Sequence, residues 1–191
     1  DQILFQYYNK NWNLKITDLH QGIVWGTQTE QTRINPILVN RFDYDGDYGT
    51  VLNRFLMQAA VGYPLTVHGT GGQTRAFIHI TDTAKCIQIA LENAPSKDSR
   101  VKIYKQMVET HRVKDLAELV SKMTHTEISY LENPTNEAPA THLHVSNNCF
   151  IEDGLKPTKL EEGLLDEVIN VANKFKNRVD LKKVPCVSTW S

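Results

Sequence analysis

The sequence contains little cysteine, no long apolar run and no excess of charge of either sign. Its 191 residues include three cysteines, too few and too scattered for a disulfide framework or a paired-cysteine zinc site, which favours a reducing compartment. Lysine and arginine number 21 against 22 acidic residues, and the net charge of −1 argues against nucleic-acid binding through a basic face. No stretch of about 18 apolar residues is present, so we expect no membrane insertion.

A glycine-rich turn near the start of the chain is also missing. A complete dinucleotide-binding fold carries such a turn after its first strand, whereas the glycines that cluster here are Gly69, Gly71 and Gly72. The chain begins with Asp1 rather than Met, and we expect a processed chain or a piece of a longer one.

Hydrophobic periodicity predicts helices alternating with strands. Apolar residues at helical spacing predict helices over 1–10, 50–61, 81–93, 113–123 and 161–176. Runs rich in β-branched residues predict strands over 14–26, 65–69, 75–80, 100–108 and 127–131. Long loops are expected over 27–49 and 132–147. This alternation indicates an α/β or α+β protein.

The loop HGTGGQTR (68–75) carries the clearest chemical signal. Its glycines would let backbone N–H groups approach a phosphate, and Arg75 could clamp it with charge-assisted hydrogen bonds. A plain hairpin turn with a surface arginine explains the same residues, and spacing alone leaves both readings open. Arg41 and Arg54 flank the preceding loop and would suit a diphosphate if they lay near Arg75.

Two polar clusters are weak candidates for a metal site. Residues 42–49 (FDYDGDYG) alternate carboxylates like a calcium loop, but Tyr48 and Arg54 stand where glycine and glutamate are required, so an Asp-stabilised turn is favoured. His142 and His144 lack the further ligands that zinc needs. The sequence therefore predicts no metal.

The run 53–93 resembles the substrate domain of extended short-chain dehydrogenase/reductases that act on nucleotide sugars, the NAD-dependent epimerase/dehydratase superfamily. Members share a helix, a G-x-P-L-x-V-x-G strand, a glycine-rich turn, an arginine, an aromatic residue and an aspartate that opens a helix. The matching residues are Gly62, Pro64, Leu65, Val67, Gly69, Arg75, Phe77 and Asp82. A narrower likeness, to a branch that adds sulfite to a nucleotide sugar, is carried by TDLHQGIVWG (17–26), NRFDYDGDYGTVLNRF (40–55), GGQTR (71–75), NPTNEA (133–138) and GLKP (154–157).

The resemblance implies the C-terminal part of an NAD(P)-binding, Rossmann-like α/β enzyme together with its smaller α+β substrate domain. Residues 1–49 would form the end of the dinucleotide-binding sheet and a long active-site loop. Residues 50–191 would form mainly the substrate domain, with returning elements of the Rossmann side. The family's catalytic Tyr-x-x-x-Lys is expected upstream of Asp1, so no catalytic residue is assigned and the chain alone is expected to be inactive.

The family reaction uses NAD to oxidise C4 of UDP-glucose; water is lost across C5–C6, sulfite adds at C6 and the hydride returns. The implied partners are a UDP-glucose-type nucleotide sugar, sulfite or a sulfite donor, and a second copy of the chain. The implied location is the cytoplasm, or the plastid stroma in a plant or alga. Two alternatives stay open: an NAD-dependent nucleotide-sugar 4-epimerase or 4,6-dehydratase, and a nucleotide-sugar-binding module without chemistry of its own.

Site roles follow from positions that match the family's motifs. The resemblance implies substrate contacts at Gln21, Arg41, Thr66, Val67, His68, Gln73, Thr74, Arg75 and Glu137. His20 and Val24 would lie on the nicotinamide side, Gln21 would take the place of a sugar-contacting asparagine, and Arg75 would clamp the diphosphate. A glutamine that only satisfies neighbouring backbone groups is the other reading of Gln21. Thr135 replaces an arginine of the family, so one phosphate or ribose contact is lost or supplied elsewhere.

Overall fold

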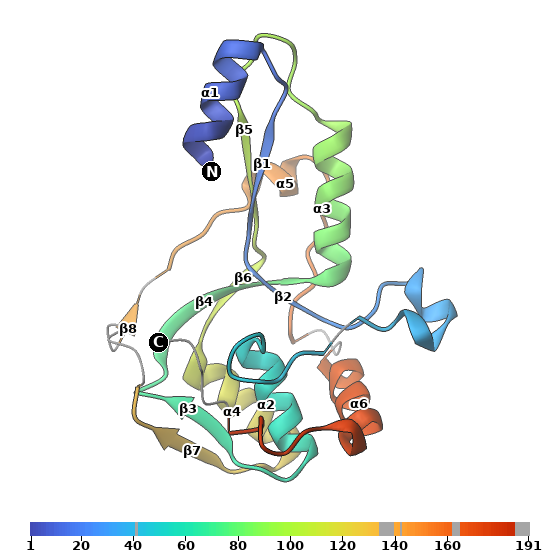
Figure 1. Cartoon of the computed structure of the whole chain (residues 1–191), viewed down its shortest axis with the longest axis vertical. Coiled ribbons are helices and arrows are strands. Elements are labelled where there is room, and N and C mark those ends of the chain that lie inside the picture. The colour runs from blue at the N-terminus through green and yellow to red at the C-terminus, as the bar shows by residue number, and fades with distance from the viewer. Residues whose placement is uncertain (41, 134–139, 142, 162–164, 186–191) are drawn as a thin grey trace.

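The computed structural model describes residues 1–40, 42–133, 140–141, 143–161 and 165–185. They form an arm, a central sheet and a body beneath it (Figure 1). The helices are α1 (Gln2–Trp12), α2 (Val51–Ala60), α3 (Ile80–Glu92), α4 (Val113–Thr124), α5 (Asn148–Glu152) and α6 (Leu165–Phe175), with 3-10 turns η1 (Thr32–Ile34), η2 (Pro36–Leu38) and η3 (Lys176–Arg178). The strands are β1 (Thr17–Gln21), β2 (Ile23–Trp25), β3 (Leu65–His68), β4 (Gly72–His79), β5 (Lys102–Gln106), β6 (Glu109–Arg112), β7 (Ile128–Leu131) and β8 (Ala140–Thr141).

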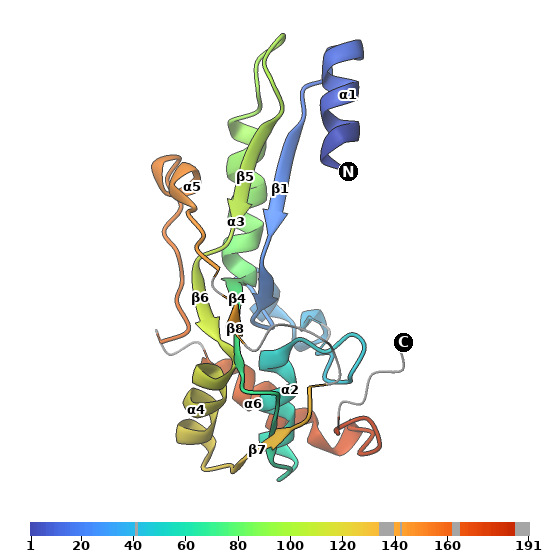
Figure 2. The same ribbon diagram turned by 90° about the vertical axis from the view of Figure 1, so that its left-hand side faces the viewer.

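Parallel pairing dominates the sheets, which fits the α/β class. In the arm β1 pairs parallel with β5, and in the body β3 pairs parallel with β7. The central sheet has the order β2-β4-β6, with β2 parallel and β6 antiparallel to β4, while β8 pairs with the beginning of β4. Figure 2 shows α1 on one side of the β1–β5 pair and α3 with α5 on the other.

The hairpin reading of residues 68–75 is wrong. β3 and β4 belong to different sheets in the described part of the chain, because the glycine turn carries the chain from the body into the central sheet. Gly71, at φ +67°, makes this turn, and its carbonyl oxygen accepts the N–H of Lys114 at 2.9 Å. A Cβ at Gly71 would lie 2.7 Å from Val67 Cγ1 and 2.9 Å from Lys114 Cβ, so only glycine fits there.

The strand expected over 14–26 is divided at Gly22. A Cβ on Gly22 would lie 2.8 Å from the carbonyl oxygen of Ala76, so the backbones of the two segments approach too closely for any other residue. The expectation that this segment is buried holds only at Trp25, since the residues of β1 are half-buried or exposed. Each half of the segment pairs with a different strand, which the sequence pattern does not reveal.

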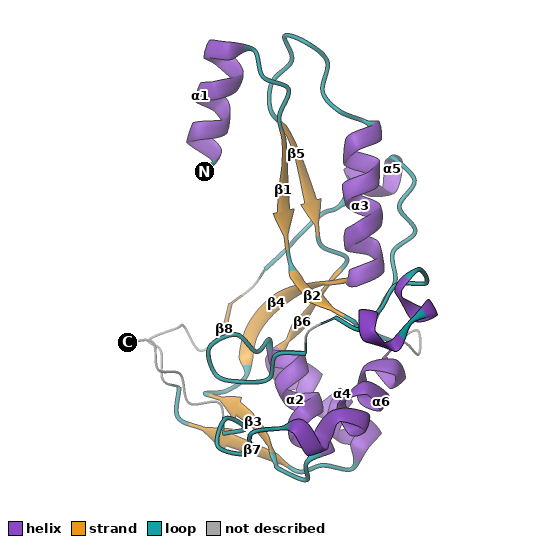
Figure 3. Cartoon of the chain, turned by 45° about the vertical axis from the view of Figure 1, so that its right-hand side comes forward, coloured by secondary structure: helices purple, strands orange, loops and turns teal. Residues whose placement is uncertain are grey.

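Two hydrophobic cores stabilise the molecule. The body and central sheet share one core made of Trp25, Leu52, Phe55, Leu56, Leu65, Val67, Phe77, Leu116, Ala117, Val120, Leu160 and Val168. The arm has a second core made of Ile78, Cys86, Ala90, Tyr104, Phe150 and Leu155. α2 and α4 bury one apolar face each in the first core, as their periodicity predicts, and Figure 3 shows them beneath the central sheet with α6.

Hydrogen bonds to two carboxylates hold the segment after α5 against the rest of the protein. Asp82 is fully buried in the first turn of α3 and accepts the N–H of Thr158 at 2.6 Å. Glu109 of β6 accepts the N–H of Leu160 at 2.8 Å. Asp82, the aspartate of the family pattern, therefore has a structural role in this protein. α3 begins at Ile80, one residue earlier than expected. The side chain of His79 caps the helix by accepting the N–H of Thr81 at 3.2 Å.

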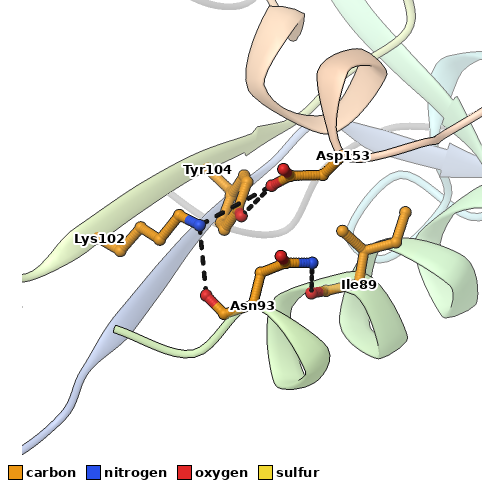
Figure 4. A network of polar contacts seen from close by, with 5 residues as sticks. All are labelled: Ile89, Asn93, Lys102, Tyr104 and Asp153. Carbon is orange, nitrogen blue, oxygen red and sulfur yellow. Dashed lines mark hydrogen bonds and ion pairs between the residues drawn. The ribbon is translucent and has the colours of Figure 1, made fainter. Parts of the chain in front are cut away.

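A polar network holds the arm together (Figure 4). The Tyr104 hydroxyl on β5 donates to Asp153, which follows α5. Lys102 Nζ lies 4.6 Å from the centre of the Tyr104 ring, 3.8 Å from Asp153 Oδ2 and 3.2 Å from the carbonyl oxygen of Asn93, at the end of α3. Burial, followed by the hydrogen bond to Asp153, raises the pKa of Tyr104, and the hydrogen bond to Tyr104 raises the pKa of Lys102. The network joins β5 to α3 and α5.

The acidic loop 42–49 is the Asp-stabilised turn that the sequence favours over a calcium loop. Asp45 Oδ1 accepts the N–H groups of Asp47 at 2.9 Å and Tyr48 at 2.7 Å. These bonds lower the pKa of Asp45, with the bond from Tyr48 as the largest cause. The carboxylate is thereby occupied by its own loop.

Replacing Gly71 should test the turn into β4. Gly71→Ala adds a strained φ and a steric overlap, so we expect a loss of at least about 3 kcal/mol in the free energy of unfolding. Gly62→Ala is the matched control, because Gly62 has a similar φ of +73° but no heavy atom within 4 Å of an added Cβ. It should cost only about 1 kcal/mol in urea unfolding. Equal losses for the two variants would show that packing at Gly71 contributes nothing.

Burial should also separate the reactivities of Cys86 and Cys149. Burial, assisted by Asp82, raises the pKa of Cys86 to about 12, whereas Cys149 is exposed. Because the thiolate is the reactive form, iodoacetamide at neutral pH should alkylate Cys149 and spare Cys86 in the folded protein, as read by peptide mass spectrometry. In urea both should react, and rapid labelling of Cys86 without denaturant would contradict this packing.

Candidate functional site

A cavity of about 310 Å³ lies where the central sheet meets the body. It is lined by Ile23, Gly49, Thr50, Val51, Arg54, His68, Gln73, Arg75, Val113 and Asn133. Three of these residues, His68, Gln73 and Arg75, are among the substrate contacts expected from the sequence. Three larger hollows, of about 540, 850 and 340 Å³, contain no described residue of that set. The smaller cavity is therefore the candidate site.

Gln73 and Arg75 lie on strand β4 and line this cavity. Side chains alternate along a strand, so these two share a face while Thr74 points to the other. Gln73 is 5% exposed, and Arg75 is half-buried with its Nη1 3.3 Å from the carbonyl oxygen of Thr74. Thr74 does not line the cavity, although the sequence places it with its neighbours.

The glycine turn before β4 positions these side chains and is held within the protein. The Gly69 N–H donates to the carbonyl oxygen of Leu131 at 2.8 Å, and the Gly72 N–H donates to Thr70 Oγ1 at 3.3 Å. Both amides thus have acceptors inside the chain. The expectation that the loop cradles a phosphate through its backbone stays a prediction, in which these two N–H groups take no part, and the loop leads the chain into the strand that carries Arg75.

The first turn of α2 forms the opposite wall. Thr50 is the N-cap residue in extended conformation, as expected, but its side chain makes no capping hydrogen bond. Arg54 follows one turn later and lines the same cavity as Arg75. The sequence analysis considers that Arg54 could lie near Arg75 but does not assign Arg54 to the site. Arg54 is the single charged residue of α2, and this isolated charge is the sequence feature that could have identified it as a site residue.

Several polar atoms around the cavity are buried without a partner. Within the described chain, Thr50 Oγ1, Arg54 Nε and Gln73 Oε1 have no hydrogen-bond partner. Buried polar groups are normally paired, and the described residues that line the cavity include two arginines and no carboxylate. The site is therefore positively charged, and its unpaired atoms can bind a ligand that carries both acceptors and a donor.

His68 lies at the end of β3 on the same cavity. Burial, and then the positive charge of Arg54, lower the pKa of His68. Both causes favour the neutral form of the imidazole, and Arg54 and His68 line the same cavity.

The other expected substrate residues lie apart from the cavity or outside the described chain. Thr66 and Val67 are buried in β3; Gln58 Nε2 donates to Thr66 Oγ1 at 2.7 Å, and Val67 belongs to the body core. Arg41 and Glu137 lie outside the described residues. The structure thus brings together three members of the expected set and adds Thr50, Arg54 and Asn133.

The expected cofactor-side residues His20 and Val24, and the expected sugar contact Gln21, lie on β1 and β2 and do not line the cavity. His20 and Gln21 end β1, where His20 Nε2 is 2.8 Å from Gln2 Nε2 and 3.0 Å from Asp18 Oδ2, and Gln21 is exposed. Val24 packs against the arm core, whereas Ile23, next to it on β2, lines the cavity. β2 therefore separates the cavity from the face that carries Val24.

No cluster of three or more metal-binding side chains occurs among the residues that the structure describes, which exclude His142. Nor does any described helix have the length and apolarity needed to cross a membrane.

Comparison with protein families and with curated proteins identifies one family and two related enzymes. Residues 27–104 match the model of the NAD dependent epimerase/dehydratase family. The chain is 43% identical over 186 residues to chloroplastic UDP-sulfoquinovose synthase of Spinacia oleracea, covering 95% of this chain and 38% of that protein. It is 37% identical over 158 residues to UDP-sulfoquinovose synthase of Sulfolobus acidocaldarius, covering 80% of this chain and 40% of that protein. The chain thus spans about two fifths of the length of these relatives.

Solved structures share the fold at lower sequence identity. UDP-glucose 4-epimerase of Thermotoga maritima, solved with UDP-glucose, superposes with a TM-score of 0.67 at 19% identity, over 93% of this chain and 52% of that one. UDP-glucuronic acid 4-epimerase of Bacillus cereus, solved with UDP-glucuronic acid and NAD, gives 0.63 at 20% identity, over 93% and 50%. These likenesses confirm the expected Rossmann-like fold, of which the chain forms about half.

The titration of His68 should report the charge of Arg54. Because the folded-state pKa is lowered, His68 stabilises the protein above its unfolded pKa of about 6.5, and this stability is lost as the pH falls through the folded pKa. In NMR titration, Arg54→Gln should raise the pKa of His68 only partly toward its ordinary value, since burial remains. His68→Gln assigns the signal. An unchanged pKa in Arg54→Gln would show that the guanidinium lies too far away to act.

Proposed function

Because the chain belongs to the NAD-dependent epimerase/dehydratase superfamily, we propose that it is the sugar-nucleotide-binding part of an enzyme like UDP-sulfoquinovose synthase. The observation that carries this proposal is the convergence of His68, Gln73 and Arg75 with the first turn of α2 on one cavity. The sequence assigns the first three to substrate binding, and the curated relatives at 43% and 37% identity bear that enzyme's name.

The chemistry of the cavity suits the diphosphate of a nucleotide sugar. Guanidinium groups form short, charge-assisted and often bidentate hydrogen bonds to phosphate. Arg75 supplies one such group on a strand that is paired on both sides, so its position is fixed by the sheet. The positive end of α2 faces the same space and favours an anion there.

NAD is the cofactor that we propose for the complete enzyme. The carboxyl end of β1 fits as one wall of its site, because His20 and Gln21 end a parallel strand pair, where α/β proteins bind ligands, and Gln21 is exposed. When bound, NAD would accept a hydride from C4 of the sugar and later return it. His20 and Val24 would orient the nicotinamide side, and Gln21 would contact the sugar.

We assign binding and orientation to this chain, and the residues of hydride and proton transfer to the part of the enzyme that precedes it. The balanced reaction is UDP-glucose plus sulfite giving UDP-sulfoquinovose plus water: C4 is oxidised, water leaves across C5–C6, sulfite forms the C6–S bond, and C4 is reduced. Residues 1–49 would complete the cofactor side and 50–191 the substrate side. On this basis the chain alone binds its substrate without turning it over.

The exposed side of the arm is where we propose that the cofactor-binding part packs. α1 has no buried residue, Ile3 is 84% and Trp12 57% exposed, and β1 pairs only with β5 among the described residues. The same side could hold a second copy of the enzyme. We propose a cytoplasmic location, or the plastid stroma for a plant or algal source, in line with the chloroplastic spinach relative.

An assay with and without sulfite separates the enzymatic alternatives. The complete polypeptide, given NAD and UDP-glucose, should form UDP-sulfoquinovose only when sulfite is added. A 4-epimerase would form UDP-galactose without sulfite, and a 4,6-dehydratase would form a 4-keto-6-deoxy sugar. A polypeptide that binds UDP-glucose and forms no product would be the non-catalytic module.

Arg75→Ala should weaken nucleotide-sugar binding in the complete polypeptide. Loss of one charge-assisted clamp should raise the UDP-glucose dissociation constant at least about tenfold, roughly 1.4 kcal/mol, in isothermal titration calorimetry. Arg112→Ala is the matched control. Arg112 lies on the neighbouring strand, is exposed, pairs with Asp115 at 2.7 Å and does not line the cavity. Wild-type affinity in Arg75→Ala would refute the assignment of the cavity to the diphosphate.

A further inference from the structure

Three large aliphatic side chains are exposed on the 3-10 turns between β2 and α2. Ile34 ends η1, whereas Ile37 and Leu38 lie in η2, and the two turns contact each other. Ile34 is 84%, Ile37 83% and Leu38 48% exposed. Figure 1 shows this loop in light blue, projecting beside α6. Apolar side chains that gather on a surface mark a site that binds a protein or a membrane. We call these three residues the aliphatic tip.

A hollow of about 540 Å³ lies between the aliphatic tip and the end of α6. Pro36 and Ile37 line it from the loop, and Val171 and Phe175 line it from α6. α6 is held in place from its other side, since Val168 is buried in the body core. The aliphatic tip and the end of α6 therefore border one apolar depression on the surface of the body.

Two exposed cations line the same depression. Lys174 Nζ lies 5.5 Å and Arg178 Cζ 4.9 Å from the centre of the Phe175 ring. Neither cation forms an ion pair with a carboxylate in the part of the chain that the structure describes. The described residues that line the depression include no carboxylate either. The charges of Lys174 and Arg178 are thus available to an anionic partner.

The residues around these cations concentrate positive charge in a chain whose net charge is −1. Within 174–183, Asp180 is the single acidic residue. The basic residues of this segment are Lys174, Lys176, Arg178, Lys182 and Lys183. Basic segments of this kind are attracted to the negative surface potential of anionic lipids, whatever the net charge of the whole protein.

We propose that the aliphatic tip and the cations beside it bind the surface of an anionic lipid bilayer, without any segment crossing it. The tip would enter the boundary between headgroups and acyl chains, while Lys174 and Arg178 would contact lipid phosphates. Apolar burial and charge attraction each give weak binding, and together they give stable but reversible binding. An acidic protein is the less suitable partner, because protein interfaces rely on Trp, Tyr and Arg as anchors rather than on branched aliphatic side chains.

Flotation of the complete polypeptide with lipid vesicles tests this proposal. Wild type should bind vesicles containing about 30% phosphatidylglycerol at least about tenfold more tightly than vesicles of phosphatidylcholine alone, and about 0.5 M NaCl should remove most of this difference. The double variant Lys174→Gln/Arg178→Gln should weaken binding to the anionic vesicles at least about tenfold. Ile34→Asp/Ile37→Asp should abolish binding, because it places two carboxylates where the apolar anchors would enter the bilayer.

Matched control variants lie on the arm, at a distance from the aliphatic tip (Figure 1). Lys97→Gln/Arg100→Gln removes two positive charges from the exposed loop that joins α3 to β5. Leu91→Asp introduces a carboxylate at a 74% exposed aliphatic residue of α3. Both variants should bind the anionic vesicles as tightly as wild type. Circular dichroism verifies that all variants are folded.

Several results would overturn the proposal, and none of them bears on the substrate cavity. Folded wild type that fails to float with anionic vesicles does not bind them. Equal binding to both kinds of vesicle, or equal loss in the arm variants, would show that the tip and its cations are not the site. Wild type that ignores vesicles but dissociates from an oligomer when Ile34→Asp/Ile37→Asp is introduced, as read by analytical ultracentrifugation, would assign the surface to a second copy of the chain instead.

Discussion

The position of α2 is the constraint on which the candidate site depends. Leu52, Phe55 and Leu56 are at most 1% exposed in the body core and fix the helix about its axis. Gln58 fixes it along the axis, because its side chain donates to Thr66 Oγ1 at 2.7 Å and accepts the Thr66 N–H at 3.1 Å. With the apolar face anchored, the polar side of the first turn must face the cavity. The same burial that stabilises the body therefore aims Arg54 toward Arg75.

This arrangement keeps positive charge in a partly buried space, where the described lining residues include no carboxylate. Two cations elsewhere have partners: Arg112 lies 2.7 Å from Asp115, and Lys102 contacts both Tyr104 and Asp153. The cavity differs, since Thr50, Arg54 and Gln73 each retain a buried atom without a partner. Such groups lower the stability of the ligand-free protein and strengthen electrostatic attraction for an anion, because nearby water is excluded.

Much of the local structure was predictable, whereas the pairing of strands was not. The apolar stripes of α2 and α4 and the stop at Gly62 follow from periodicity and glycine chemistry. Gln73 and Arg75 were identified by motif and share a face because of the period of two in a strand. Arg54 joined them only through tertiary packing, since β3 pairs with β7 and β4 with β2 and β6. The spacing of residues within one strand does not show which distant strand it pairs with. The sequence of the glycine turn therefore fits a hairpin between β3 and β4 as well as the observed pairing.

Strand β2 couples the two halves of the proposed site. It is three residues long, pairs parallel with β4 and follows β1 directly after Gly22. Ile23 lines the cavity and Val24 packs against the arm core, so one pleat separates the proposed diphosphate side from the proposed cofactor side. A shift of one residue in the pairing of β2 with β4 would exchange these faces. Gly22 opposes such a shift, because it is where the chain approaches the carbonyl oxygen of Ala76 too closely for a side chain. The register of one short strand thus determines which side chains face the proposed sugar-nucleotide site and which face the proposed cofactor side.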